Sequence, residues 1–356
     1  MRLSEYKEII GGILGIRKVI IANTDNVYEC FPDITLTKTG RLIVVYRESD
    51  SHTAHSFSHI VYRYSDDWGE NWSEKHILIE SYVRDGVLLK WNCPRIGTMP
   101  DGKIWILCDR YLQPPGEMDH KQSRICFWWS EDEGESWTGP YESNIYGIVP
   151  SKIFVTRKGT WLIGTHMKSI RTGKLMQIVW RSIDGGKSWQ GPIVVCEDEK
   201  YNCCEGSIIQ LPNGELVCYM RENSRMRWPG LKCFSNDDGL TWEGPYQTLI
   251  QGCHRPVAGI LSSGRILITY RNYLGGKSPN KNFFAYIETI ESSRARKISE
   301  QAGIILQIDH DRSSRPDTGY SGWVQLPDGK IFCVNYIVDD AKYAQIRGYW
   351  FSEKDF

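Results

Sequence analysis

The stretch SNDDGLTW, residues 235–242, contains a pattern that occurs four times in the chain. The pattern is Ser-x-Asp-x-Gly-x-x-Trp, and its other copies are SDDWGENW (65–72), SEDEGESW (130–137) and SIDGGKSW (182–189). The Asp can accept hydrogen bonds from its own turn, the Gly can adopt a positive φ, and the Trp can pack back onto a sheet. Each copy therefore predicts a tight, structural connection between two β-strands.

A second unit recurs around these turns: an apolar run, a glycine turn and another alternating run. GSIIQLPNGELVCYMR, residues 206–221, is one example. The six turn glycines are Gly40, Gly102, Gly159, Gly214, Gly264 and Gly329. Repeats of roughly 50 to 65 residues with about four short strands each are typical of propeller blades, which bury their faces only against neighbouring blades.

The sequence thus predicts an all-β fold, a six-bladed β-propeller in one domain spanning residues 1–356, with residues 1–16 as an N-terminal extension. RKVIIANTD (17–25) and QIRGYWFS (345–352) are expected to share one blade and close the ring. A double-sheet sandwich with a second domain is the alternative architecture, but it does not account for six equal units.

Composition narrows the classes of partner. The chain has 43 Lys plus Arg and 43 Asp plus Glu, so no net field favours nucleic acid or a membrane surface. Fourteen Trp and nineteen Tyr suit a carbohydrate, whose apolar ring faces stack on aromatic side chains. The N-terminal stretch has neither a cleavage site nor a membrane-span pattern, so we expect a soluble cytoplasmic protein.

The eleven cysteines show no zinc-like spacing. They predict reduced, mostly structural thiols, and the sequence indicates no metal and no cofactor.

Register places two sets of side chains at one mouth of the central channel. The positions nine residues before each turn glycine are Phe31, Cys93, Pro150, Glu205, Arg255 and Tyr320, with Cys30 as an alternative to Phe31. The positions seven residues after each are Arg47, Asp109, His166, Arg221, Arg271 and Tyr336. Because the guanidinium fork matches a carboxylate, the arginines predict an anionic or strongly hydrogen-bonding substrate.

With six such hairpins and four Asp-boxes, the chain resembles the sialidase (neuraminidase) superfamily of six-bladed propellers over nearly its whole length. CCEGSIIQLPNGELVCYMR resembles the family segment in which a Glu precedes an Arg by sixteen residues, here Glu205 and Arg221. GYSGWVQLPDG resembles the last-blade Tyr-Ser segment, which implies that Tyr320 is the nucleophile. The resemblance implies that Glu205 removes the Tyr320 proton, an Asp on a first-blade loop is the general acid, and three arginines hold the substrate carboxylate.

Three positions depart from this family. Cys30 stands where the first Arg is expected, Lys281 where the third is expected, and Thr53 near the expected Asp. Asp50, His52 and His55 are therefore the candidates for the general acid. The predicted catalytic residues are Tyr320, Glu205, Asp50 and His55, and the predicted substrate-binding residues are Arg47, Arg95, Asp109, His166, Arg221, Arg255, Arg271 and Lys281.

These residues favour a sialidase-like exo-glycosidase acting on a sialic-acid-like or other acidic sugar. Two alternatives remain open on the same fold. One is a lyase of uronic-acid glycans, in which His166 or Tyr320 would abstract a proton. The other is a glycan-binding propeller without catalysis.

Overall fold

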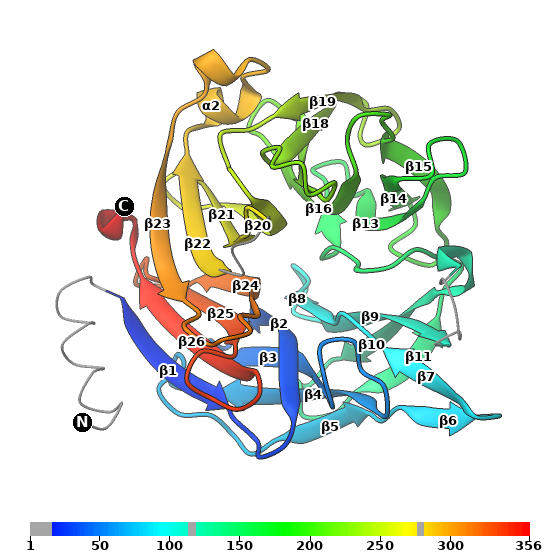
Figure 1. Cartoon of the computed structure of the whole chain (residues 1–356), viewed down its shortest axis with the longest axis vertical. Coiled ribbons are helices and arrows are strands. Elements are labelled where there is room, and N and C mark those ends of the chain that lie inside the picture. The colour runs from blue at the N-terminus through cyan, green and yellow to red at the C-terminus, as the bar shows by residue number, and fades with distance from the viewer. Residues whose placement is uncertain (1–15, 113–118, 276–280) are drawn as a thin grey trace.

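The computed structural model describes residues 16–112, 119–275 and 281–356, and in this part of the chain six β-sheets surround a central axis (Figure 1). The predicted six-bladed β-propeller is therefore confirmed. Residues 1–15 of the expected N-terminal extension lie outside the described residues. Among the described helices, none combines the length and the apolar character that crossing a bilayer requires.

Four blades are four-stranded sheets in which each strand pairs with the next along the chain. The first contains β2 (Tyr28–Leu36), β3 (Leu42–Ser49), β4 (Ser58–Ser65) and β5 (His76–Ile79). The third contains β12 (Phe154–Val155), β13 (Trp161–Lys168), β14 (Leu175–Ser182) and β15 (Gln190–Cys196). The fourth contains β16 (Cys203–Gln210), β17 (Leu216–Glu222), β18 (Leu231–Ser235) and β19 (Glu243–Gln247), and the fifth contains β20 (Cys253–Ile260), β21 (Ile266–Asn272), β22 (Asn282–Glu288) and β23 (Gly303–His310).

The second blade has an extra hairpin that the repeat did not predict. Its strands are β6 (Tyr82–Arg84), β7 (Val87–Trp91), β8 (Arg95–Thr98), β9 (Ile104–Leu112), β10 (Arg124–Ser130) and β11 (Thr138–Glu142), and β7 and β8 both pair with β9. Within the described ranges the short helices are α2 (Ile290–Arg294), on the outer rim in Figure 1, and three 3-10 turns at His120–Gln122, Ile298–Glu300 and Glu353–Asp355.

The sixth blade joins both ends of the chain, as predicted. Strand β1 (Arg17–Ala22) pairs with β26 (Gln345–Phe351), which continues through β25 (Ile331–Ile337) to the innermost strand β24 (Thr318–Gln325). In Figure 1 the blue β1 lies beside the red β26. Buried Asp309 of β23 accepts from Lys18 of β1 (2.6 Å) and from Arg347 (3.2 Å) and Tyr349 (2.8 Å) of β26, so one carboxylate links the closing strands to the fifth blade.

The repeated Ser-x-Asp-x-Gly-x-x-Trp segments connect the last two strands of four blades, away from the axis. In one of them Asp67 Oδ1 accepts from the Ser65 hydroxyl (2.8 Å) and from the Asn71 N–H (2.9 Å), while Gly69 adopts φ +95°. The Trp72 indole donates to the Gly69 carbonyl (3.1 Å). These carboxylates bind within their own turns, as the sequence predicted.

The cysteines depart from the prediction at one pair. Cys196 at the end of β15 and Cys203 at the start of β16 form a disulfide. The other nine cysteines, all within the described residues, are free and buried, as expected for structural thiols.

Bulges interrupt the innermost strands where they reach the mouth. The pairing register shifts at residues 31–32, 205–206, 255–256 and 319–320. Phe31, Glu205 and Arg255 adopt φ of +57°, +55° and +52°, which is uncommon for such residues. A bulge re-aims a side chain, so these three point where an unbroken alternation would not send them.

The role of Asp309 gives a test of ring closure. Asp309→Ala is expected to lower the free energy of unfolding by about 2–3 kcal/mol, because Lys18 and Arg347 each lose a hydrogen bond to a buried carboxylate. Glu70→Ala is the matched control: Glu70 pairs with the neighbouring β1 residue Arg17, but both side chains are exposed, so the loss should stay below about 1 kcal/mol. Urea unfolding of both variants would measure the difference, and equal losses would contradict this view of closure.

Candidate active site

Three side chains from two blades meet at the central mouth. The Tyr320 hydroxyl on β24 donates to Glu205 Oε1 on β16. Arg221 at the end of β17 donates to Glu205 Oε1 (3.0 Å) and to the Tyr320 oxygen (3.2 Å), and its other nitrogen binds Asn223 (2.6 Å). Tyr320 and Glu205 are 6% and 4% exposed, so this hydrogen-bonded group is largely shielded from water.

The environment keeps the tyrosine neutral and the glutamate ionised. Burial and the Glu205 charge raise the pKa of Tyr320 above its usual value, against the opposing effect of Arg221. Burial would raise the pKa of Glu205, but the charges of Arg221 and Arg255 hold it well below its usual value. The pair is therefore a phenol donor bonded to a carboxylate that can act as its base.

A second network surrounds Asp317, which lies just before β24 and which sequence analysis missed. Asp317 Oδ1 pairs with Arg271 (3.2 Å) and Lys281 (2.9 Å), and Oδ2 lies 2.5 Å from Nδ1 of His52. Burial opposes ionisation, but Arg271, His52 and Lys281 hold the pKa of the Asp317 carboxyl well below its usual value. The guanidinium of Arg271 also lies 4.6 Å from the centre of the Tyr320 ring, so this network borders the Tyr320–Glu205 pair.

Of the three general-acid candidates on the first-blade loop, Asp50 and His55, the two predicted catalytic residues, bond within the loop itself. Asp50 accepts from the backbone N–H groups of His55 and Ser56 (both 2.8 Å). Burial raises its pKa, but bonds from Ser56 and these amides lower it more, to about 2, so Asp50 stays ionised and caps its own loop. His55 is exposed and bonds Thr53.

His52 is the member of this loop that reaches the site. Its ring packs edge-on against Phe31 (5.2 Å between ring centres), and Phe31 packs against Tyr320 (5.1 Å). Arg47 donates to the His52 carbonyl (2.5 Å) and to Asn92 (3.0 Å), and its guanidinium lies 4.4 Å from the Phe31 ring. Arg47 is thus engaged in holding the loop that carries His52.

Phe31, rather than Cys30, faces the mouth from the first blade. Cys30 is fully buried opposite Arg47 in the β2–β3 pairing, and burial raises the pKa of its thiol to about 11. The position where the superfamily carries its first arginine therefore contributes no cation here.

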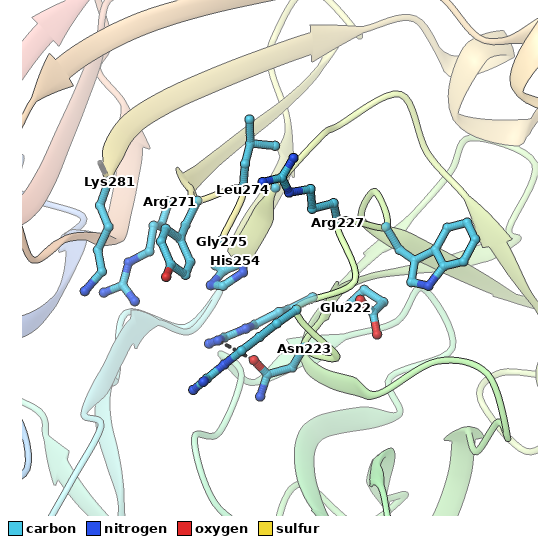
Figure 2. A pocket seen from close by; sticks show the side chains of 13 residues that line it. Glu222, Asn223, Arg227, His254, Arg271, Leu274, Gly275 and Lys281 are labelled. Atoms are coloured by element: carbon cyan, nitrogen blue, oxygen red, sulfur yellow. Dashed lines mark hydrogen bonds between the residues drawn. The ribbon is translucent and has the colours of Figure 1, made fainter. Parts of the chain in front are cut away.

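A cleft of about 230 Å³ opens beside these groups. Figure 2 shows Arg271 and Lys281 on one side of the cleft and Glu222 and Asn223 on the other. Its described lining includes the cations Arg221, Arg225, Arg227, Arg271 and Lys281, with Glu222 as the one carboxylate. This balance favours an anionic ligand.

Four remaining candidates lie deeper and serve other contacts. Asp109 is fully buried, and its oxygens accept from Asn92 and from the backbone N–H groups of Cys93 and Val149, so it joins the second and third blades. Arg255 donates to the Val149 and Pro150 carbonyls, and Arg95 donates to the Ser321 carbonyl. His166 is buried, which lowers its pKa to about 3 and keeps it neutral.

Part of this arrangement can be recognised in the sequence. Pro32, Pro150 and Pro256 each follow a residue with positive φ, and a proline without an N–H fits an unpaired bulge position. Asp317 has no such signal, because no other blade carries a carboxylate at the equivalent place. Among the described residues, no three His, Cys, Asp or Glu side chains are grouped as metal ligands would be.

Comparisons with known proteins agree with this architecture. The chain matches the family of BNR repeat-like domains over residues 40–333. No curated protein sequence matches it.

Several solved structures share the fold. A protein of unknown function from Dyadobacter fermentans is 21% identical with a TM-score of 0.74, and the match covers 95% of this chain and 99% of that one. The Hadza microbial sialidase Hz136 is 16% identical (TM-score 0.72, 95% and 69% covered). An α-L-arabinanase from Penicillium chrysogenum, solved with arabinobiose, is 13% identical (TM-score 0.65, 95% and 98% covered).

Buried His166 makes stability depend on pH. Its pKa is about 3 in the folded protein and about 6.5 when unfolded, so between these values the unfolded chain binds more protons and stability falls as pH falls. His166→Gln is expected to remove about 1.4 kcal/mol per pH unit from this slope between pH 6 and 4.5. Exposed His55→Gln is the control and should leave the slope unchanged; urea unfolding at a series of pH values would measure both. An unchanged slope in His166→Gln would mean that this histidine titrates normally.

Proposed function

The chain belongs to the BNR repeat-like family and has the sialidase-like glycosidase fold, and from that premise we propose that it is a retaining exo-glycosidase for acidic sugars. The observation that carries the proposal is the hydrogen-bonded group of Tyr320, Glu205 and Arg221 beside a cationic cleft. A neutral tyrosine suits a substrate whose own carboxylate lies beside the reacting carbon, since an anionic nucleophile would be repelled.

In the first step the Tyr320 oxygen bonds to the anomeric carbon as its proton passes to Glu205. The bond to the leaving oxygen breaks at the same time, and that oxygen takes a proton from the general acid. Water then attacks the anomeric carbon and gives a proton back to the group that acted as general acid. The bond between this carbon and Tyr320 breaks, and Glu205 returns the first proton to the released Tyr320 oxygen.

We assign the general acid to His52. Its Nδ1 is paired with Asp317, which leaves Nε2 to exchange a proton with the substrate. Asp317 also stabilises the imidazolium that donates this proton. Asp50 cannot take this role while its pKa stays near 2.

Arg221, Arg271 and Lys281 are the groups we assign to the substrate carboxylate. Arg271 and Lys281 share Asp317, so their combined charge is only half neutralised by it. With Arg225 and Arg227 at the rim, the cleft keeps a net positive charge for an acidic sugar.

The nucleophile is tested with a fluorogenic 4-methylumbelliferyl α-sialoside. Tyr320→Phe is expected to lower kcat/KM by about 10³-fold or more, because the bonding oxygen is lost. Tyr270→Phe is the matched control: Tyr270 is also fully buried, and its hydroxyl has no hydrogen-bond partner within residues 16–112, 119–275 and 281–356, so activity should persist.

The substrate class is tested in the same assay with a glucuronide and a neutral arabinofuranoside. Turnover of the arabinofuranoside alone would refute the acidic-sugar assignment. An ultraviolet-absorbing unsaturated product from a uronic-acid glycan would instead indicate a lyase.

The general acid is tested by its dependence on the leaving group. His52→Gln is expected to slow cleavage of a sugar–sugar bond by about 10²–10⁴-fold and cleavage of the methylumbelliferyl bond much less, because that leaving group needs little protonation. His55→Gln on the same loop should change neither rate. Equal slowing on both substrates would argue against proton donation by His52.

A further inference from the structure

A second cavity, of about 150 Å³, lies farther along the innermost strands than the catalytic pair. Its walls are residues 151–154, 206–208 and 256–258 from the third, fourth and fifth blades, with Arg95 and Arg255. It shares none of its lining residues with the cleft described above. The proposed hydrolytic reaction assigns it no role.

Arg95, which lines this cavity, has a free hydrogen-bonding edge. The residue is 2% exposed, and Nη1 donates to the Ser321 carbonyl (3.2 Å) and lies 3.8 Å from Asp33 Oδ1. Nε and Nη2, by contrast, have no hydrogen-bond partner in the described part of the chain. Buried charged donors are costly to leave unpaired, and these two nitrogens form the edge of a guanidinium that binds an oxyanion in a bidentate way.

The charged side chains around the cavity are mostly positive as well. Lys152 pairs with Asp33 (3.1 Å), so one buried carboxylate faces both Lys152 and Arg95. Arg255 gives its two terminal nitrogens to backbone carbonyls, and its Nε, too, has no partner among the described residues. Three cations therefore line the cavity, and the Asp33 carboxylate faces two of them. Buried charges are normally paired.

We propose that this cavity is a binding site for a small oxyanion, held by the free edge of Arg95. The Nε group of Arg255 and the Lys152 ammonium add positive charge. Ser207 can donate its hydroxyl hydrogen, because its oxygen already accepts from the Ala258 N–H (3.0 Å). At about 30 Å³ per water molecule, the volume accommodates an ion of phosphate size together with water.

The site also lies next to the catalytic pair. Arg255 lines the cavity, and its guanidinium is 6.0 Å from the centre of the Tyr320 ring. A bound anion would hold this guanidinium in place.

Inorganic phosphate is the probe for the test, with sodium chloride at equal ionic strength as the control salt. Calorimetric titration of the wild-type chain is expected to show one phosphate bound, and the melting temperature should be higher in phosphate than in sodium chloride. Arg95→Lys keeps a charge beside Asp33 but removes the bidentate edge, so the dissociation constant should rise at least about tenfold. Arg227→Lys, in the outer cleft, should leave it unchanged.

Each outcome bears on the proposal. Phosphate binding that survives in Arg95→Lys and weakens in Arg227→Lys would place the ion in the outer cleft and overturn the proposal. An absence of phosphate binding, or an equal effect of chloride, would overturn it too. Crystals of the wild-type chain soaked in selenate give a second reading that needs no variant. Anomalous density beside Arg95 supports the site, and its absence there refutes it.

Discussion

The candidate active site depends on the hydrogen bond between a neutral tyrosine and an ionised glutamate. Tyr320 comes from the sixth blade and Glu205 from the fourth, 115 residues earlier in the chain. Burial keeps the phenol protonated, and Arg221 keeps the carboxylate ionised although it, too, is buried. The propeller supplies the geometry, because the innermost strands of all blades reach the same mouth.

The cations around the central mouth fall into two groups according to their contacts. Arg47, Arg95 and Arg255 donate to backbone carbonyls and so fix loops and strand ends around the axis. Arg221, Arg271 and Lys281 line the outer cleft, where each is partly neutralised by a carboxylate of the chain itself. Arginines at equivalent positions of the repeat therefore do not all bind one substrate, because most of the deeper guanidinium groups already donate to backbone carbonyls.

The sequence was sufficient for the architecture because each blade repeats the same turn chemistry and the same apolar alternation. It also identified Tyr320, Glu205 and Arg221, since their spacing to the turn glycines carries them to the mouth. Register counting treats each strand as unbroken, however, and could not foresee the bulges that rotate Phe31 and Arg255. Asp317 lies outside the repeat, and its partner His52 is 265 residues away, so only the folded chain reveals that network.

Closure of the propeller ring by β1 and β26 affects the order in which the chain can fold. During synthesis β1 emerges before blades one to five and its partner β26 emerges after them, so an open strand edge persists until all six blades have been made. Contacts this distant in sequence form slowly, because a very long loop must close before they contribute any stability. The sixth blade also carries Tyr320, so the earlier blades can stack in sequence, but Tyr320 and Glu205 cannot meet until the sixth blade has been made.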